Sequence, residues 1–154
     1  MRLVRLVGHL DKLEAAKKNG AEILINRHDG DVDKQIQEKV GGVHAAVVTA
    51  VSPSAFDQAV DSLRPDGKLV AVALPQGDMK LNIAKTVLDG IIVAGSLVGT
   101  RQDLAECFQF GAEGKVHPIV KTRKLSEIND MIQELKDNKV VGRNVVDFVH
   151  NDND

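Results

Sequence analysis

Residues 43–74 read VHAAVVTAVSPSAFDQAVDSLRPDGKLVAVAL and hold a complete strand–helix–strand pattern. The apolar run from Val43 to Thr49 predicts a strand. Ser52 followed by Pro53 predicts the start of a helix, because serine accepts hydrogen bonds from free N–H groups there and proline suits the first turn. The stretch from Leu69 to Leu74 is almost continuously apolar, which is typical of a parallel strand buried on both faces.

The same alternation continues on both sides of this stretch. Apolar runs predict further strands at Leu3–Val7, Ile23–Ile25, Ile91–Ala94, Ile119–Val120 and Val145–Val149. Apolar residues at helical spacing predict helices over Leu10–Asn19, Val32–Val40, Leu81–Leu88, Leu104–Phe108 and Ile128–Leu135. Strands alternating with helices predict an α/β fold, a parallel sheet with helices on both faces. No linker interrupts the pattern, so we expect one domain over residues 1–149 and a polar tail over residues 150–154.

Local signals mark the ends of several elements. Glycine commonly ends a helix, whereas serine, threonine and aspartate commonly begin one. On these grounds we expect helix ends at Gly20 and Gly41, a turn at Pro65-Asp66-Gly67, and helix starts at Asp31, Thr100–Asp103 and Ser126.

The composition is that of an ordinary globular chain. The 154 residues carry a net charge of −2 and only 3% aromatic side chains, without tryptophan or tyrosine. We therefore expect no nucleic acid and no membrane as partners, because both need concentrated positive or apolar surface. The first residues are too charged for a signal peptide, and one cysteine rules out an internal disulfide, so a cytoplasmic protein is expected.

The common catalytic motifs are missing from the sequence. There is no glycine-rich phosphate loop of either usual pattern, and the five histidines are scattered without ligand-like spacing. Cys107 falls on an apolar helical stripe, where a small buried residue is expected rather than a nucleophile. The residues alone therefore indicate an α/β domain, with no catalytic residues and no zinc expected in this chain.

Six segments, taken in order, carry a resemblance to a known family. They are Lys12–Ala21, Val47–Ser52, Leu63–Val70, Leu74–Gly77, Gly95–Arg101 and Val141–Phe148. Their order resembles the C-terminal part of the zinc-dependent, medium-chain alcohol dehydrogenases, closest to the tetrameric ethanol dehydrogenases of yeasts and bacteria. The resemblance covers almost the whole chain. It implies an incomplete Rossmann fold, in which the first strand, its glycine-rich turn and the zinc-binding catalytic domain would precede Met1.

The resemblance also implies a cofactor, NAD or NADP, and positions that would contact it. Lys12 is expected near the adenosine ribose, and Thr49 and Ala50 at the strand ends beneath the cofactor. The positions expected at the nicotinamide end are Val72, Ala73, Leu74, Ser96 and Val98, and Arg143 is expected at the cofactor phosphate. Where the family has the acidic residue that holds the ribose 2′-hydroxyl, this sequence has Val7, which leaves the choice between NAD and NADP open.

The resemblance raises the question of how the sheet is completed, since the family places the missing first strand in the middle. Three arrangements remain open: the sheet closes up, a second copy lends a strand, or the first half is disordered. We expect closure, with Leu3–Val7 in the first-strand position and Ile23–Asn26 beside it. The resemblance also implies that the strand Ile91–Ala94 is a sheet edge that pairs with its mate across a two-fold axis. Its residues are apolar and uncharged, so a homodimer through this strand is expected.

Three functions are compatible with these observations. The chain is expected to be the cofactor-domain fragment of an alcohol dehydrogenase, in a family that converts alcohol and NAD(P) to aldehyde or ketone and NAD(P)H, and to be inactive alone. The alternatives are a nucleotide-binding subunit of a split enzyme, whose catalytic domain is a separate chain, and a folded remnant that binds no ligand.

Overall fold

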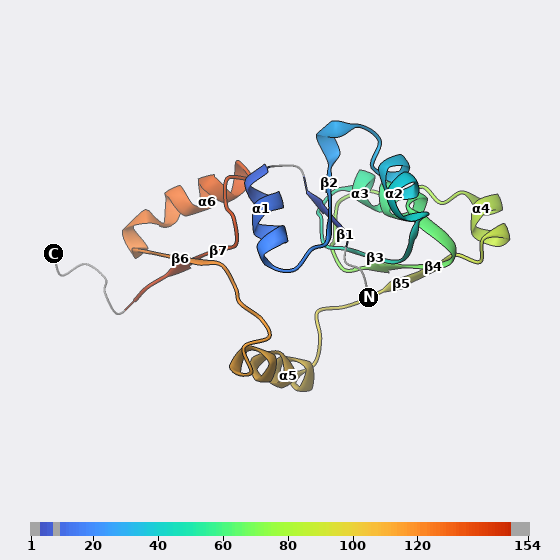
Figure 1. The fold of residues 1–154 in the computed structure, drawn as a ribbon. Coiled ribbons are helices and arrows are strands. Elements are labelled where there is room, and N and C mark those ends of the chain that lie inside the picture. Colours follow the sequence, from blue (N-terminus) through green and yellow to red (C-terminus); the bar gives the residue numbers. More distant parts are fainter. Residues whose placement is uncertain (1–3, 8–9, 149–154) are drawn as a thin grey trace. The chain divides into compact units, whose positions relative to one another are not determined.

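The computed structural model describes residues 4–7 and 10–148 (Figure 1). The chain divides into two compact units, Met1–Leu104 and Ala105–Asp154, where the sequence pattern had shown no internal boundary. The predicted polar tail at 150–154 and the residues Gly8 and His9 lie outside the described part.

Helices and strands alternate through both units, which confirms the predicted α/β class. The first unit holds β1 (Val4–Val7), α1 (Leu10–Lys18), β2 (Ile23–Asn26), α2 (Val32–Val40), β3 (Val43–Val48), α3 (Pro53–Asp61), β4 (Leu63–Ala71), α4 (Ile83–Leu88) and β5 (Ile92–Gly95). Helix α5 (Arg101–Ala112) crosses the boundary between the units. The second unit holds β6 (Val120–Arg123), α6 (Ile128–Lys136) and β7 (Arg143–Val146), and short 3-10 turns occupy Arg27–Asp29 and Leu125–Glu127.

The strands form three parallel sheets. β1 pairs with β2, the order β3-β4-β5 makes a second sheet, and β6 pairs with β7. The expected closure is therefore wrong, because in the described residues β1 has no hydrogen-bonded strand other than β2 and does not join β3. Side-chain packing links the two sheets instead of strand pairing, since α2 contacts both β2 and β3 over one apolar cluster.

Strand β4 differs from its prediction at both ends. It begins at Leu63 and ends at Ala71, so Val72–Leu74 continue beyond the strand rather than within it. The expected turn at Pro65-Asp66-Gly67 is accommodated inside β4, where the pairing with β3 jumps from Val43↔Leu63 to Ala45↔Lys68. Asp66 has a φ of 60°, and a Cβ on Gly67 would lie 2.7 Å from the Arg64 carbonyl oxygen, so this bulge needs glycine there.

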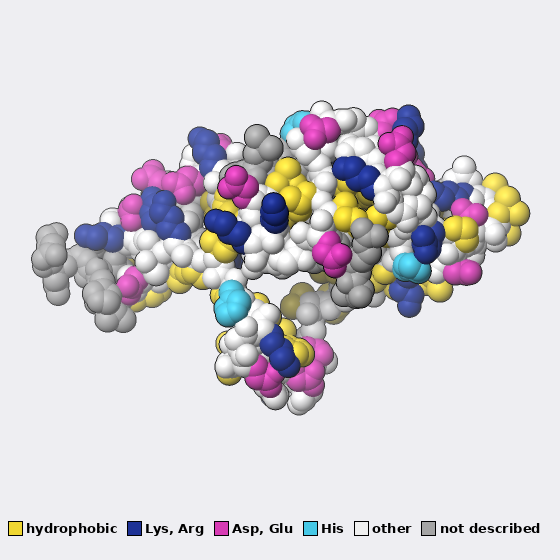
Figure 2. Space-filling view, in the orientation of Figure 1, with side chains coloured by type: hydrophobic (Ala, Val, Ile, Leu, Met, Phe, Trp, Pro, Cys, Tyr) yellow, Lys and Arg dark blue, Asp and Glu magenta, His cyan; other side chains and the backbone are white. Residues whose placement is uncertain are grey.

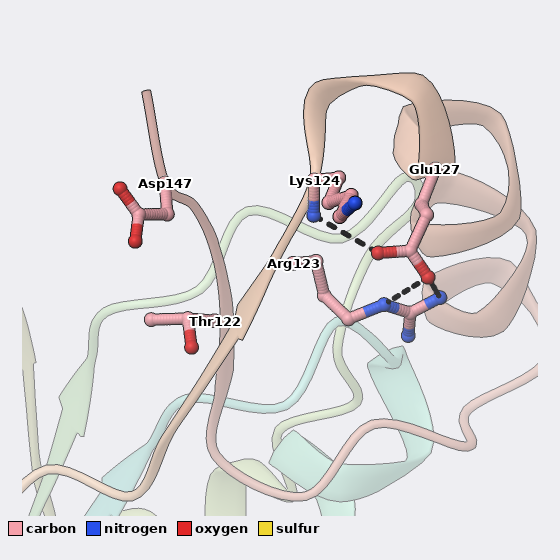
Figure 3. A pocket seen from close by; sticks show the side chains of 5 residues that line it. All are labelled: Thr122, Arg123, Lys124, Glu127 and Asp147. Carbon is pink, nitrogen blue, oxygen red and sulfur yellow. Dashed lines mark hydrogen bonds and ion pairs between the residues drawn. The ribbon is translucent and has the colours of Figure 1, made fainter. Parts of the chain in front are cut away.

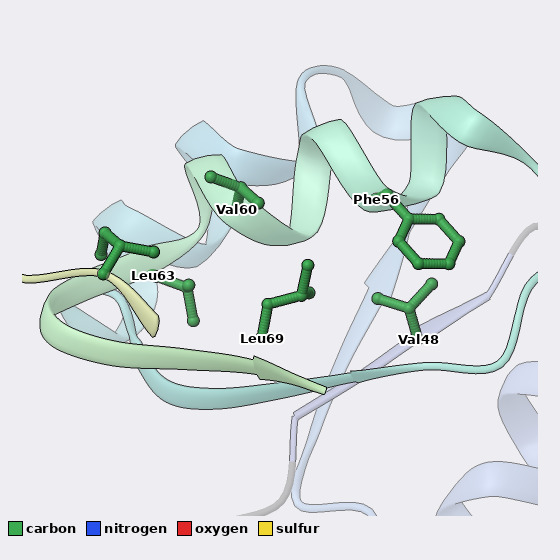
Figure 4. Packing of buried hydrophobic residues seen from close by; sticks show 6 residues of the cluster. Val48, Phe56, Val60, Leu63 and Leu69 are labelled. Carbon is green, nitrogen blue, oxygen red and sulfur yellow. The ribbon is translucent and has the colours of Figure 1, made fainter. Parts of the chain in front are cut away.

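The main apolar core lies between α3 and the sheet β3-β4-β5 (Figure 4). Phe56 and Val60 point from α3 toward Val48 and Leu69, and the Leu69 side chain is 0% exposed. Burial of these side chains fixes α3 on one face of the sheet. A second cluster joins β2 to α2 through Ile25, Val32 and Ile36.

Several predicted helix ends are confirmed. Gly41 adopts the left-handed conformation with a φ of 68°, and its N–H donates to the carbonyl of Gln37. Thr100 and Asp103 bond reciprocally: the Thr100 N–H donates to the Asp103 carboxylate at 2.6 Å, and the Asp103 N–H donates to the Thr100 hydroxyl at 3.3 Å. This capping box satisfies free N–H groups at the start of α5.

Three local expectations need correction. Asp31 stands at the N-cap of α2, but its side chain makes no capping bond and instead pairs with Lys34. Ser126 is not the N-cap of α6. It lies inside the 3-10 turn Leu125–Glu127, and the helix that follows begins at Ile128 with Glu127 as its N-cap. Cys107 is exposed rather than buried, since α5 has no buried residue and its apolar stripe faces solvent.

Candidate functional site

The carboxyl ends of β3, β4 and β5 meet at one edge of their sheet, because the three strands are adjacent and parallel. The segments that follow them are held by bonds to the neighbouring strands. The N–H groups of Val72 and Ala73 donate to the carbonyl of Val48 at 3.2 and 3.0 Å, and the Ser96 N–H donates to the carbonyl of Ala71 at 2.9 Å. The ordered ends of three strands therefore form one surface.

We call this surface the carboxyl-edge ledge; it consists of Thr49, Ala50, Val72, Ala73, Leu74, Ser96 and Val98. Most of these side chains are exposed, with Leu74 at 87% and Val98 at 99%. Ala73 is half-buried and packs against the main core, which anchors the ledge. None of the seven carries a charge, so the ledge suits an uncharged planar group better than a phosphate.

Seven of the nine cofactor positions that the resemblance implied therefore lie shortly after the carboxyl ends of β3, β4 and β5. Lys12 lies on α1, half-buried, within the same unit. Arg143 begins β7 in the second unit and is exposed. A cofactor phosphate contact from Arg143 stays a prediction, as does the ribose contact from Lys12.

The described residues contain no candidate metal site. Within 4–7 and 10–148, no three side chains of histidine, cysteine, aspartate or glutamate gather closely enough to hold an ion. The described residues therefore offer no ligand set for the zinc of the family that the sequence resembles. In the same ranges, no helix is both long and apolar enough to cross a membrane.

A polar pocket in the second unit was missed by sequence reasoning (Figure 3). Thr122, Arg123, Lys124, Glu127 and Asp147 line it, and the Arg123 guanidinium points at the Glu127 carboxylate. Arg123 Nη2 lies 2.8 Å from Glu127, and Nη1 lies 3.2 Å from Glu134 on α6. The four-residue spacing of Arg123 and Glu127 was a weak signal for one of these pairs.

The Arg123 network is a structural element. The second carboxylate oxygen of Glu127 accepts from the Lys124 N–H at 2.9 Å, and Glu134 accepts from the Asn144 amide at 3.3 Å, so β6, α6 and β7 are joined. Hydrogen bonds from Arg123 lower the pKa of both glutamates, and those same bonds raise the pKa of Arg123. All three groups remain charged near neutral pH and bind one another, so none of them is suited to act as a general acid or base.

Charge over the visible surface is mixed. Basic and acidic side chains are interspersed over the face shown in Figure 2, and apolar side chains gather over α4. The apolar members on α4 are Ile83, Val87 and Leu88, all exposed.

Comparison with known proteins places the chain in a family. Residues 2–113 match the family described as zinc-binding dehydrogenase. The chain belongs to the zinc-binding dehydrogenases. It is 46% identical over 138 residues to an alcohol dehydrogenase of Moraxella sp. (strain TAE123), covering 90% of this chain and 41% of the relative. It is 47% identical over 136 residues to an alcohol dehydrogenase of Geobacillus stearothermophilus, covering 88% of this chain and 40% of the relative.

Solved structures agree with the sequence comparison. The alcohol dehydrogenase of the archaeon Aeropyrum pernix superposes with a TM-score of 0.86 at 29% identity, covering 93% of this chain and 42% of that chain. The chain thus corresponds to the C-terminal part of alcohol dehydrogenases and spans about two fifths of the length of the relatives it matches. The resemblance drawn from the six sequence segments is confirmed.

Proposed function

We propose that this zinc-binding dehydrogenase chain is the cofactor-domain part of an NAD(P)-linked alcohol dehydrogenase, and that it is inactive alone. The observation that carries this proposal is the carboxyl-edge ledge. In open parallel sheets, nucleotides bind outside the carboxyl ends of the strands, and here three strands end in one exposed, uncharged surface.

The ledge residues would receive the nicotinamide end of the cofactor. Val72, Leu74 and Val98 would contact the ring through apolar side chains, and Ser96 would offer polar groups to its carboxamide. When bound, NAD(P) supplies the hydride acceptor, and these residues hold its ring in place. The ledge has no charge for a pyrophosphate and the sequence has no glycine-rich phosphate loop, which supports weak binding by this chain alone.

The proposed inactivity rests on the missing chemistry. Alcohol oxidation needs a group that polarises the alcohol oxygen, and the family uses zinc for this purpose. One cysteine and five scattered histidines do not supply a ligand set. We therefore place the alcohol-binding and zinc-binding functions in other parts of the enzyme.

Calorimetric titration with NADH and with NADPH tests this proposal. We expect saturable binding in the high micromolar range, no alcohol oxidation and no bound zinc. Leu74→Asp should abolish binding because it places a charge on the ledge, whereas Val87→Asp on α4 is the matched control and should leave binding unchanged. Absence of binding by the unaltered chain would favour a folded remnant without a ligand.

We further propose a homodimer through the edge strand β5. β5 ends the order β3-β4-β5, and the described residues offer no strand to its outer edge. Ile92 and Val93 on this strand are exposed. Light scattering should show a dimer that Ile92→Lys converts to a monomer, because charged side chains protect strand edges from pairing. Leu135→Lys, an exposed site in the second unit, is the control; a monomeric unaltered chain at high concentration would contradict the proposal.

A further inference from the structure

The C-terminal end of α1 is followed by the one asparagine–glycine pair in the sequence, Asn19-Gly20. Asn19 is exposed and lies directly after Lys18, and its side-chain amide donates to the carbonyl of Ala15 at 2.9 Å. Gly20 has a φ of 89°, a conformation that glycine adopts freely and that strains other residues. The glycine that ends the helix therefore also places an unhindered backbone nitrogen beside an asparagine side chain.

The surroundings leave this pair open to reaction. A Cβ on Gly20 would meet no atom within 4 Å apart from its neighbours in the chain. The Gly20 N–H donates to the carbonyl of Lys17 at 3.0 Å, a bond that belongs to the terminal turn only. Helix ends open more often than helix centres, so fraying of this turn frees both the nitrogen of Gly20 and the amide of Asn19.

Asn26 and Asn82 provide a contrast within the same unit. Their side-chain oxygens accept from backbone N–H groups at 3.1 and 3.0 Å, which holds both side chains in capping positions. The residues that follow them, Arg27 and Ile83, carry side chains that hinder approach to the backbone nitrogen. Asn19 differs from both in its neighbour and in the bond that restrains it.

We propose that Asn19 is a site of spontaneous deamidation, at which the modified side chain loosens the last turn of α1. The backbone nitrogen of Gly20 attacks the side-chain amide carbon of Asn19 and forms a succinimide ring. The bond from that carbon to the side-chain nitrogen breaks, and ammonia leaves with the proton of the Gly20 N–H. Water then opens the ring at either carbonyl, which gives aspartate or isoaspartate and releases one proton. Asparagine is among the chemically labile residues of proteins, and the reaction needs no enzyme and no oxidant.

The product changes the end of the helix. A carboxylate cannot donate to the carbonyl of Ala15, and its charge lies beside free carbonyl groups that already carry partial negative charge. Lys17 and Lys18 in the last turn offset part of this repulsion. Leu13 is buried and holds the preceding turn, so the loosening should stay at the C-terminal end of α1.

Peptide mapping by mass spectrometry tests the modification on the full chain, kept folded in mildly alkaline buffer. We expect the mass increase of deamidation at Asn19 at a rate at least about tenfold above the rates at Asn26 and Asn82. Both aspartate and isoaspartate should appear at position 19, because a succinimide opens to both, whereas direct hydrolysis gives aspartate alone. Equal rates at the three asparagines, a product without isoaspartate, or reaction only in denaturant would overturn the proposal.

Two variants separate the reaction from its effect on the helix. Asn19→Gln keeps an amide and should slow the reaction at this position by about tenfold or more, because its longer side chain must close a larger ring. Asn19→Asp supplies one product directly and should speed amide hydrogen exchange in the last turn of α1 by about two- to fivefold, with exchange in β3 unchanged. Undiminished reaction in Asn19→Gln, or unchanged exchange in Asn19→Asp, would contradict the proposal.

Discussion

Different interactions stabilise the interior of each of the two units. In the first unit, apolar side chains from α2, α3 and three strands form two buried clusters. In the second, Met131 is the one buried apolar side chain among the described residues, while Arg123 is only 12% exposed and binds two glutamates. Burial of apolar surface is insensitive to pH, whereas paired charges are not, so the units should respond differently to the same perturbation.

The largest expected effect is on the first unit. Leu69→Ala should lower its free energy of unfolding by roughly 2–5 kcal/mol, because it opens a cavity at the centre of the main core. Hydrogen exchange with mass spectrometry should show faster exchange across β3 and β4 and unchanged exchange in β6 and β7. Val98→Ala removes an exposed side chain and should have no effect; equal loss of protection in both units would contradict the comparison.

A drop in pH should act on the second unit. The ordinary pKa of a glutamate is 4.5 here, and Arg123 lowers the pKa of Glu127 and Glu134 below it. A lowered pKa in the folded state contributes stability that is complete above 4.5 and is lost as the pH falls through the folded-state values. Exchange in β6, α6 and β7 should therefore accelerate with acid before exchange in the main core does, after correction for the intrinsic rate.

The Arg123→Gln variant tests whether this network, rather than other carboxylates, makes the second unit sensitive to acid. The variant should destabilise the second unit at neutral pH, since two carboxylates lose their shared partner, and should remove most of the pH dependence. The first unit should keep its unfolding midpoint. An unchanged acid response in Arg123→Gln would show that other carboxylates govern the stability of this unit.

The smallest effect is expected for an exposed pair in the first unit. Lys34→Gln breaks the ion pair with Asp31, in which both side chains are more than half exposed. Solvent screens such a pair, so the unfolding midpoint measured by circular dichroism should not change. A clear loss of stability would mean that Asp31 contributes more to the start of α2 than its missing capping bond indicates.

Local signals in the sequence predicted the fold better than they predicted its long-range pairing. Ser52-Pro53 and Gly41 mark helix ends at the right residues, because proline in the first turn and left-handed glycine depend on neighbouring residues only. The expected capping bond from the Ser52 side chain is absent. The separation of β1 from β3 depends on packing between distant segments, which no local pattern encodes. The prediction that Cys107 is buried was wrong for the same reason, since helical spacing shows that a stripe is apolar but not what covers it.

For the candidate site, seven ledge positions came from family resemblance rather than from chemistry visible in the residues. Val72, Leu74 and Val98 look like any apolar strand residues until adjacent parallel strands place them at one edge. The Arg123 network was not found because Glu134 and Asn144 reach it from α6 and β7, eleven residues or more from Arg123 along the chain.

The exposed cysteine on α5 has a practical consequence. Cys107 is the sole thiol in a chain that has neither tryptophan nor tyrosine. A maleimide dye would therefore attach at one position, with almost no intrinsic emission to subtract. That position lies three residues beyond Leu104, on the helix that passes from one unit to the other, so the fluorescence anisotropy of the labelled chain would follow α5 as cofactor or partner is added.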